Sequence, residues 1–146
     1  MLSILRNSAD LWNYFLTIVL IIKSVIHSIA ELDRRLSLLS DIEFFSSYER
    51  HYCLSKSKPL PSFSGIWCAK EAFSQAIANL DQSPRCPFLD IEVCHDSNGR
   101  PYIGLKNYLT QWCHDKRMAI NLSISHSREF AAASVLLYSV QNDGTV

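Results

Sequence analysis

The stretch from Phe63 to about Leu80 limits the fold of this chain more than any other, because its apolar residues recur at steps of three and four. That spacing predicts a helix with one apolar stripe, which has to face a core. Two prolines and two lysines in residues 55–62 predict a solvated loop before the helix, and two prolines in residues 81–87 end it. The apolar positions are Ile66, Ala69, Phe73, Ile77 and Leu80.

The second half of the chain has the alternation that is typical of strands. Residues 89–105 hold two alternating segments around Asn98-Gly99, a pair that tolerates positive φ and therefore predicts a hairpin. Residues 119–126 alternate isoleucine or leucine with asparagine or serine, and residues 129–140 predict one more strand. Residues 106–116 predict a short helix between the hairpin and these strands.

Two short helices are predicted in the first half. Residues 30–39 place Leu32, Leu36 and Leu39 on one side of a helix. Ser46, with Glu49 three residues later, has the capping-box spacing at the start of a helix over residues 46–54. Taken in order, these elements show no internal repeat and predict a single α+β domain, with an antiparallel sheet packed on helices.

An uncharged apolar run covers residues 11–22 and stops at Lys23. It is shorter than the ~20 residues that a membrane helix needs, and its β-branched residues favour a buried strand that continues to Ile29. A signal anchor stays open as the alternative, because Asn13 and Thr17 are only modest obstacles to insertion. The first ten residues carry too little basic character for a transit peptide.

Charge and cysteine content argue against several classes of protein. Fourteen basic residues balance fourteen acidic ones, so affinity for nucleic acid through phosphate neutralisation is not expected. Five cysteines without a C-x-x-C spacing indicate reduced intracellular thiols rather than a disulfide framework or a zinc site. In the pairs Cys94-His95 and Cys113-His114 the neighbouring side chains point in different directions, which does not suit one metal ion.

Lys70 and Glu71 interrupt the apolar, Ala-rich part of the long helix. Glu71 lies beside the apolar stripe on the face of Trp67, with Gln75 one turn later. A carboxylate at the edge of a core is costly unless it is paired, hydrogen-bonded or bound to a metal ion. The alternative is an exposed ion pair on an ordinary helix surface.

A second polar cluster closes the strand predicted over residues 119–126. His126 is flanked by Ser125 and Ser127 and is followed by Arg128, so hydroxyls, an imidazole and a guanidinium gather at one strand end. Such a cluster suits phosphate binding. The alternative is a turn whose serines bond the backbone locally, and the residues alone leave both interpretations open.

The chain resembles the holo-acyl-carrier-protein synthases, the short branch of the 4'-phosphopantetheinyl transferases, in the order and spacing of three segments: WCAKEAFSQAI, LDIEVCHDSNGRPYIGL and NLSISHSREFAAASVLL. FSSYERHYC also resembles the segment that precedes the Lys-Glu helix of that family. The resemblance covers about residues 24–137. It implies a 4'-phosphopantetheinyl transferase-like fold.

The resemblance also implies an activity: transfer of phosphopantetheine from coenzyme A to a serine of an apo-acyl carrier protein, with Mg²⁺ as cofactor and release of 3',5'-ADP. Glu71 matches a catalytic glutamate that is a metal ligand, and oxygen ligands suit magnesium. Lys70 matches the adjacent lysine, a catalytic and substrate-binding residue that pairs with phosphate or carboxylate. His126 and Ser125 match the strand end that contacts coenzyme A.

The chain departs from the family pattern at several positions. Ser28 stands where the family has an aspartate metal ligand, and Glu31 is the metal ligand that we expect to compensate. Ile66 replaces an arginine and Gln75 replaces a lysine. The missing positive charge has four candidate sources: Arg34, Arg35, Lys56 and Lys58. The alternative function is therefore a diverged family member that binds a carrier protein or coenzyme A without catalysis.

The resemblance further predicts the setting of the protein. We expect a homotrimer with sites at subunit interfaces, coenzyme A and an apo-acyl carrier protein as partners, and a role in fatty acid biosynthesis. The expected compartment is the cytoplasm, with the mitochondrion as the alternative. Residues 1–23 are predicted as an N-terminal extension and the start of the first strand, residues 24–140 as the domain, and residues 141–146 as a flexible tail.

Overall fold

The computed structural model describes residues 16–40, 43–80 and 82–142. Four helices, one 3-10 turn and five strands occur within these ranges. They are β1 (Leu16–Ser28), α2 (Ile29–Leu36), α3 (Ser47–Leu54), α4 (Pro59–Ala78), η1 (Phe88–Asp90), β2 (Ile91–His95), β3 (Pro101–Leu105), α5 (Tyr108–Asp115), β4 (Ala119–His126) and β5 (Phe130–Asn142).

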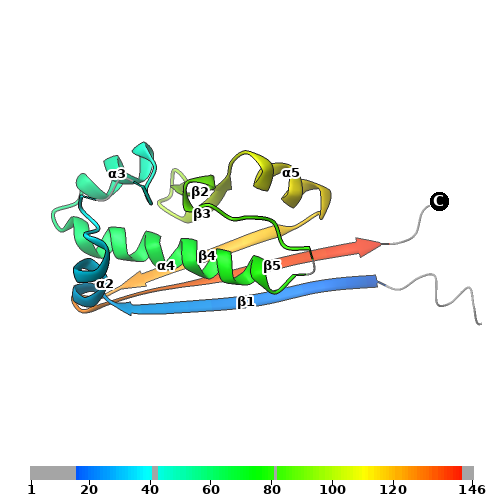
Figure 1. Ribbon diagram of the computed structural model, residues 1–146, viewed down its shortest axis with the longest axis horizontal. Coiled ribbons are helices and arrows are strands. Elements are labelled where there is room, and N and C mark those ends of the chain that lie inside the picture. The colour runs from blue at the N-terminus through cyan, green and yellow to red at the C-terminus, as the bar shows by residue number, and fades with distance from the viewer. Residues whose placement is uncertain (1–15, 41–42, 81, 143–146) are drawn as a thin grey trace, which may run out of the picture.

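A three-stranded antiparallel sheet of order β1-β5-β4 forms one layer, and α4 lies lengthwise along it (Figure 1). The β2–β3 hairpin forms a separate two-stranded sheet, and with α3 it lies beside the helix. The expected α+β class, the antiparallel sheet and the hairpin at residues 89–105 are confirmed. Strand β5 continues through Asn142, so the sheet extends beyond the domain end predicted at residue 140.

Four of the five predicted stripe residues of α4 are buried, as their spacing predicts; the fifth, Leu80, lies beyond the helix end at Ala78 and is half-buried. Ile66, Ala69, Phe73 and Ile77 are all buried. Gly65 allows the helix to approach β4, because a Cβ at this position would lie 2.7 Å from Cγ2 of Ile124. This close approach fixes the distance between the helix that carries Glu71 and the strand that ends in His126.

Several helix boundaries differ from the prediction. Helix α4 begins at Pro59 rather than at Phe63, because a proline lacks only an N–H that the first turn of a helix leaves unpaired anyway. Helix α2 ends at Leu36, where Ser37 adopts a left-handed conformation with φ 48°. The turn that follows buries Leu38 and leaves Leu39 exposed, so the predicted role of Leu39 on the apolar side was wrong.

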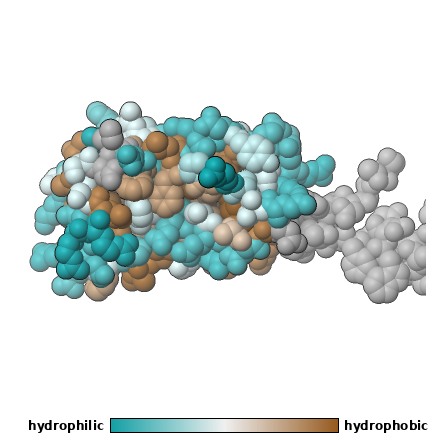
Figure 2. Space-filling view, viewed as in Figure 1, coloured by the Kyte–Doolittle hydropathy of each residue, from teal (hydrophilic) through white to brown (hydrophobic). Residues whose placement is uncertain are grey.

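Strand β1 is buried on one face, not on both. It is an edge strand, and Leu20, Ile22 and Ile26 on its outer face are 62%, 66% and 67% exposed. Figure 2 shows apolar atoms along part of the lower border, where Figure 1 places β1. Within the described ranges, no helix has the length and hydropathy needed to cross a bilayer. The start of the apolar run, residues 11–15, lies outside the described residues.

The hairpin turn uses one residue with positive φ. Gly99 has φ 79°, whereas Asn98 keeps an ordinary backbone conformation. Asp96 closes the turn, since its Oδ1 accepts hydrogen bonds from the backbone N–H groups of Asn98 and Arg100 at 2.8 and 2.9 Å. The Asn-Gly signal therefore located the hairpin correctly, while the loop is longer than a two-residue turn.

Candidate active site

Lys70 forms a buried ion pair with Glu49, in which both side chains are 0% exposed and Nζ lies 2.7 Å from Oε2. The ammonium also donates to the backbone oxygens of Phe44 and Phe88 at 2.8 and 2.9 Å. Burial lowers the pKa of Lys70 and raises that of Glu49, because desolvation penalises both charges more than their attraction favours them. The pair is therefore expensive to bury, and its hydrogen bonds compensate for that cost.

Glu49 joins three elements at this point. Its Oε2 accepts from the backbone N–H of Ser46 at 2.8 Å, which completes the predicted capping box of α3. Its Oε1 accepts from the backbone N–H of Val93 in β2 at 2.8 Å. Lys70 in α4 supplies the third contact, so one carboxylate ties α3 and α4 to the hairpin. The catalytic and substrate-binding role predicted for Lys70 stays a prediction, and contact with a substrate phosphate requires the pair to open.

Glu71 points to the other side of α4 and is partly exposed. Its Oε2 lies 2.7 Å from Nε2 of His27 and accepts from the indole N–H of Trp67 at 3.2 Å. Its Oε1 accepts from the amide of Gln75 at 3.3 Å. His27 and Glu71 are 23% and 29% exposed, so the carboxylate sits at the edge of the core and remains open to solvent. The adjacent Lys70 and Glu71 thus belong to two different environments.

His27 is the site residue that our sequence reasoning missed. In β1 it pairs with Ala131 of β5, and Ala131 pairs in turn with His126 of β4. Residues directly opposite in antiparallel strands project from the same face, so His27 and His126 lie on the α4 face, on either side of Ala131. The alternation from Val25 was the available signal, since residue 27 then has to face inward.

Ser28 and Glu31, the predicted metal-site positions on β1 and α2, have a local role in the structure. Alternation places Ser28 on the strand side opposite to His27. The hydroxyl of Ser28 accepts from the backbone N–H of Glu31 at 3.4 Å and caps α2. The Glu31 side chain is exposed in the first turn of that helix. Its predicted role as a metal ligand stays a prediction.

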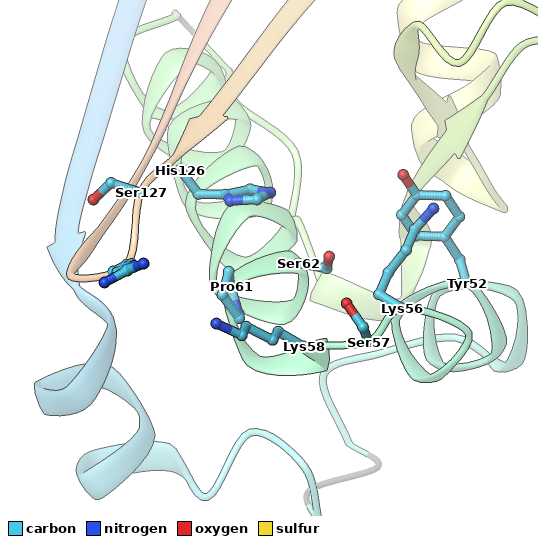
Figure 3. Close-up of a pocket in the computed structure, with 9 residues that line it drawn as sticks. Tyr52, Lys56, Ser57, Lys58, Pro61, Ser62, His126 and Ser127 are labelled. Atoms are coloured by element: carbon cyan, nitrogen blue, oxygen red, sulfur yellow. The ribbon is translucent and has the colours of Figure 1, made fainter.

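A pocket of about 610 Å³ opens where β4 ends, beside the start of α4. Figure 3 shows His126 extending across α4 toward residues of the α3–α4 link. The ammonium of Lys56 lies 4.3 Å from the centre of the Tyr52 ring at the pocket wall. The lining residues are Tyr52, Lys56, Ser57, Lys58, Pro61, Ser62, His126, Ser127 and Arg128.

Among the described residues that line it, the pocket has three permanent cations and no acidic side chain, which suits an anionic ligand such as a phosphate ester. Lys56 and Lys58, two of the candidate substitutes for the lost family cations, belong to it, as does the predicted residue His126. Ser125 is exposed and, by alternation, faces away from the side that carries His126, while Ser127 lines the pocket. The substrate contact predicted for Ser125 stays a prediction.

The donor set around Glu71 fits a divalent cation only in part. Among the described residues, no group of three or more His, Cys, Asp or Glu side chains is arranged to hold a metal ion. Magnesium in enzyme sites is commonly bound through one or two carboxylates together with substrate phosphates. Glu71 can supply one such oxygen, since its Oε1 makes the longest of its three hydrogen bonds and the side chain is partly exposed. The residues thus fit a cation completed by the phosphates of a substrate.

Comparison with known proteins defines the class. The model of the 4'-phosphopantetheinyl transferase superfamily matches residues 26–134, so the chain belongs to this superfamily.

Within that class, the chain is similar to curated proteins named holo-[acyl-carrier-protein] synthase. The one from Protochlamydia amoebophila is 35% identical over 89 residues, which cover 61% of this chain and 70% of the relative. The one from Halothermothrix orenii is 39% identical over 95 residues, covering 63% and 73%. The solved Chronobacterium ammoniagenes ACPS-CoA complex is 26% identical with a TM-score of 0.72 and covers 85% of this chain and 99% of that one. The predicted family, fold and transferase class are confirmed.

Proposed function

We propose that this protein transfers the 4'-phosphopantetheine group of coenzyme A to a serine of an apo-acyl carrier protein. The observation that carries the proposal is the placement of a cationic pocket and a partly exposed carboxylate on one face of the sheet. His126 of β4 lines the pocket, and His27 of β1 contacts the carboxylate of Glu71. Both histidines pair with Ala131 of β5. Family membership and the coenzyme A complex of the similar C. ammoniagenes protein support it.

In this proposal the pocket binds the phosphates of coenzyme A. Lys56, Lys58 and Arg128 neutralise their charge, and His126 contributes a hydrogen bond from the end of β4. Positioning and charge stabilisation then supply most of the catalysis, as in other phosphoryl transfers. The serine oxygen bonds to the phosphorus that carries pantetheine, the bond from that phosphorus to the bridging oxygen breaks, and 3',5'-ADP leaves with the electron pair while the serine proton passes to water.

Glu71 holds the divalent cation in the same proposal, with Mg²⁺ as the ion expected from the family. Such a cation neutralises developing charge on the transferring phosphoryl group when it is bound. Trp67 and Gln75 orient the carboxylate through their hydrogen bonds. Lys70 acts indirectly, because its ion pair with Glu49 holds α4, the helix that carries Glu71, against α3 and β2.

We further propose that the protein assembles as a homotrimer through the outer face of its sheet. Leu20, Ile22 and Ile26 form an exposed apolar row on β1, and solvent-facing rows of this kind commonly mark protein contacts. Residues of a neighbouring subunit then complete the pocket at the end of β4. The cytoplasm remains the proposed compartment, with the mitochondrion as the alternative.

The decisive test incubates the purified chain with coenzyme A, Mg²⁺ and an apo-acyl carrier protein and follows the intact mass of the carrier. We expect a phosphopantetheine increment, and we expect 3',5'-ADP among the products. A folded protein that binds coenzyme A yet modifies none of several carriers would instead support the non-catalytic alternative.

A substitution at Glu71 tests the site within the same assay. Glu71→Gln keeps the shape of the side chain but removes its charge, so transfer should fall about a hundred- to a thousand-fold while the unfolding midpoint changes little. Glu129→Gln is the matched control, because Glu129 is exposed and lies outside the pocket lining. Equal loss in both variants, or in neither, would contradict the role of Glu71.

A further inference from the structure

The imidazole of His27 adds a nitrogen donor to the carboxylate of Glu71. The inward positions of β1 before it are Ile21, Lys23 and Val25, so His27 is the last inward side chain of the strand. Its ring reaches α4, where Nε2 lies 2.7 Å from Oε2 of Glu71. Both side chains keep about a quarter of their surface exposed, at 23% and 29%, so a ligand can reach the pair from solvent.

The spacing of these two atoms suits a shared cation. Two ligands at right angles, each about 2.1 Å from a metal ion, lie about 3 Å apart. Nε2 of His27 and Oε2 of Glu71 are 2.7 Å apart, so only a small opening would admit an ion between them. In the hydrogen bond to the Glu71 carboxylate, Nε2 of His27 carries the proton, because a carboxylate oxygen accepts. To bind a cation through Nε2, the neutral ring has to carry its proton on Nδ1 instead.

A nitrogen donor changes which ions the site prefers. Imidazole suits transition-metal ions such as Zn²⁺, Fe²⁺ and Ni²⁺, whereas Mg²⁺ and Mn²⁺ favour oxygen ligands. The oxygen of Ser28 does not substitute here, because the strand register directs it away from His27 and it caps α2. The side chains that meet at this point therefore form a mixed nitrogen and oxygen pair.

We propose that His27 is a direct ligand, through Nε2, of the divalent cation that Glu71 binds, and that it gives the site a preference for transition-metal ions that bind imidazole, such as Zn²⁺ and Fe²⁺, over Mg²⁺. The inference rests on the proposed function, because the substrate phosphates of that function complete the coordination of the ion. The His27–Ala131–His126 row supports that completion, since it places the cationic pocket on the same sheet face.

The test is pulsed electron paramagnetic resonance of Mn²⁺ bound to the full chain with unlabelled coenzyme A and ¹⁵N-labelled protein. Coupling of the electron spin to ¹⁵N then reports a protein nitrogen ligand and excludes the adenine nitrogens of coenzyme A. We expect ¹⁵N coupling in the wild type and its loss in His27→Gln, an amide that can still donate a hydrogen bond to Glu71. Zn²⁺ affinity should fall about tenfold or more in that variant, while Mg²⁺ affinity changes little.

His114→Gln is the matched control, because His114 and Asp115 form an exposed imidazole–carboxylate pair with 3.6 Å between Nδ1 and Oδ1. It should keep both the coupling and the affinity. Absence of ¹⁵N coupling in the wild type, or its persistence in His27→Gln, would overturn the proposal and leave His27 as a hydrogen-bond partner of Glu71. Transfer to carrier protein, measured on the same preparations, tests the proposed function separately: coupling without transfer overturns that function and supports the ligand role of His27.

Discussion

Replacing Lys70 by methionine should destabilise the protein strongly, because it leaves the Glu49 carboxylate in the core without its counter-charge. Both side chains are 0% exposed, so water cannot take over the role of the ammonium. Breaking such a pair typically costs about 3 to 5 kcal/mol. The backbone oxygens of Phe44 and Phe88 also lose a donor. For a domain of this size the unfolding midpoint should fall by roughly 6 to 20 °C.

Urea and thermal unfolding followed by circular dichroism measure this loss. Lys70→Met combined with Glu49→Gln should recover part of it, because glutamine still satisfies the capping-box spacing and carries no charge. Burial already raises the pKa of Glu49, and loss of Lys70 removes the charge that opposes this rise. A carboxyl with a raised folded pKa contributes stability below its unfolded pKa and loses it as the pH rises through the folded value. The loss of free energy of unfolding in Lys70→Met, relative to the wild type, should therefore grow from about pH 5 toward neutrality.

The refuting result combines stability with activity. If Lys70→Met keeps its free energy of unfolding within about 1 kcal/mol of the wild type and nevertheless loses transfer, the ammonium contacts substrate and the structural role is wrong. Lys106→Met is a useful comparison, because Lys106 pairs with Glu92 at 2.8 Å on the surface, where such pairs contribute about 0 to 1 kcal/mol.

Three further outcomes are expected. Gly65→Ala should lower stability by about 1 to 3 kcal/mol in urea unfolding, because its methyl group meets Ile124, and adding Ile124→Ala should relieve the strain; an additive loss would contradict the contact. Ile26→Asp should give a smaller particle in light scattering at unchanged helicity, and an unaltered mass would count against assembly through the outer sheet face. Burial raises the pKa of Cys68 to about 12, so iodoacetamide at neutral pH should label this thiol only after unfolding, whereas rapid labelling in the native state would show that the region opens.

The fold was largely predictable because its elements carry local signals. Alternation located β4 and the hairpin, and the steps of three and four located α4, since these periods follow directly from backbone geometry. Ser46 and Glu49 predicted the start of α3 correctly for the same reason. The start of α4 was misplaced because prolines were taken to break the helix, although the first turn accepts them.

The candidate site was less predictable, because its contacts depend on which strands are neighbours. His27 meets Glu71 only through the β1–β5 register and the packing of α4 on the sheet. Adjacency in the sequence was also misleading for Lys70 and Glu71, which lie one residue apart and point to different sides of the helix. No local pattern reports the burial of Lys70, since its partners come from α3, the link between α2 and α3, and η1.

The sheet register also sets the order in which the chain can fold during synthesis. Among the described strands β1 pairs only with β5, and about 100 residues lie between them, which a ribosome needs roughly 5 to 20 s to add. During that interval β1 has no partner strand, and its apolar residues, including Leu20, Ile22 and Ile26, are available for contacts between nascent chains. Substitutions that delay the docking of β5 should therefore reduce the yield of folded protein in the cell even when the free energy of unfolding of the purified product is unchanged.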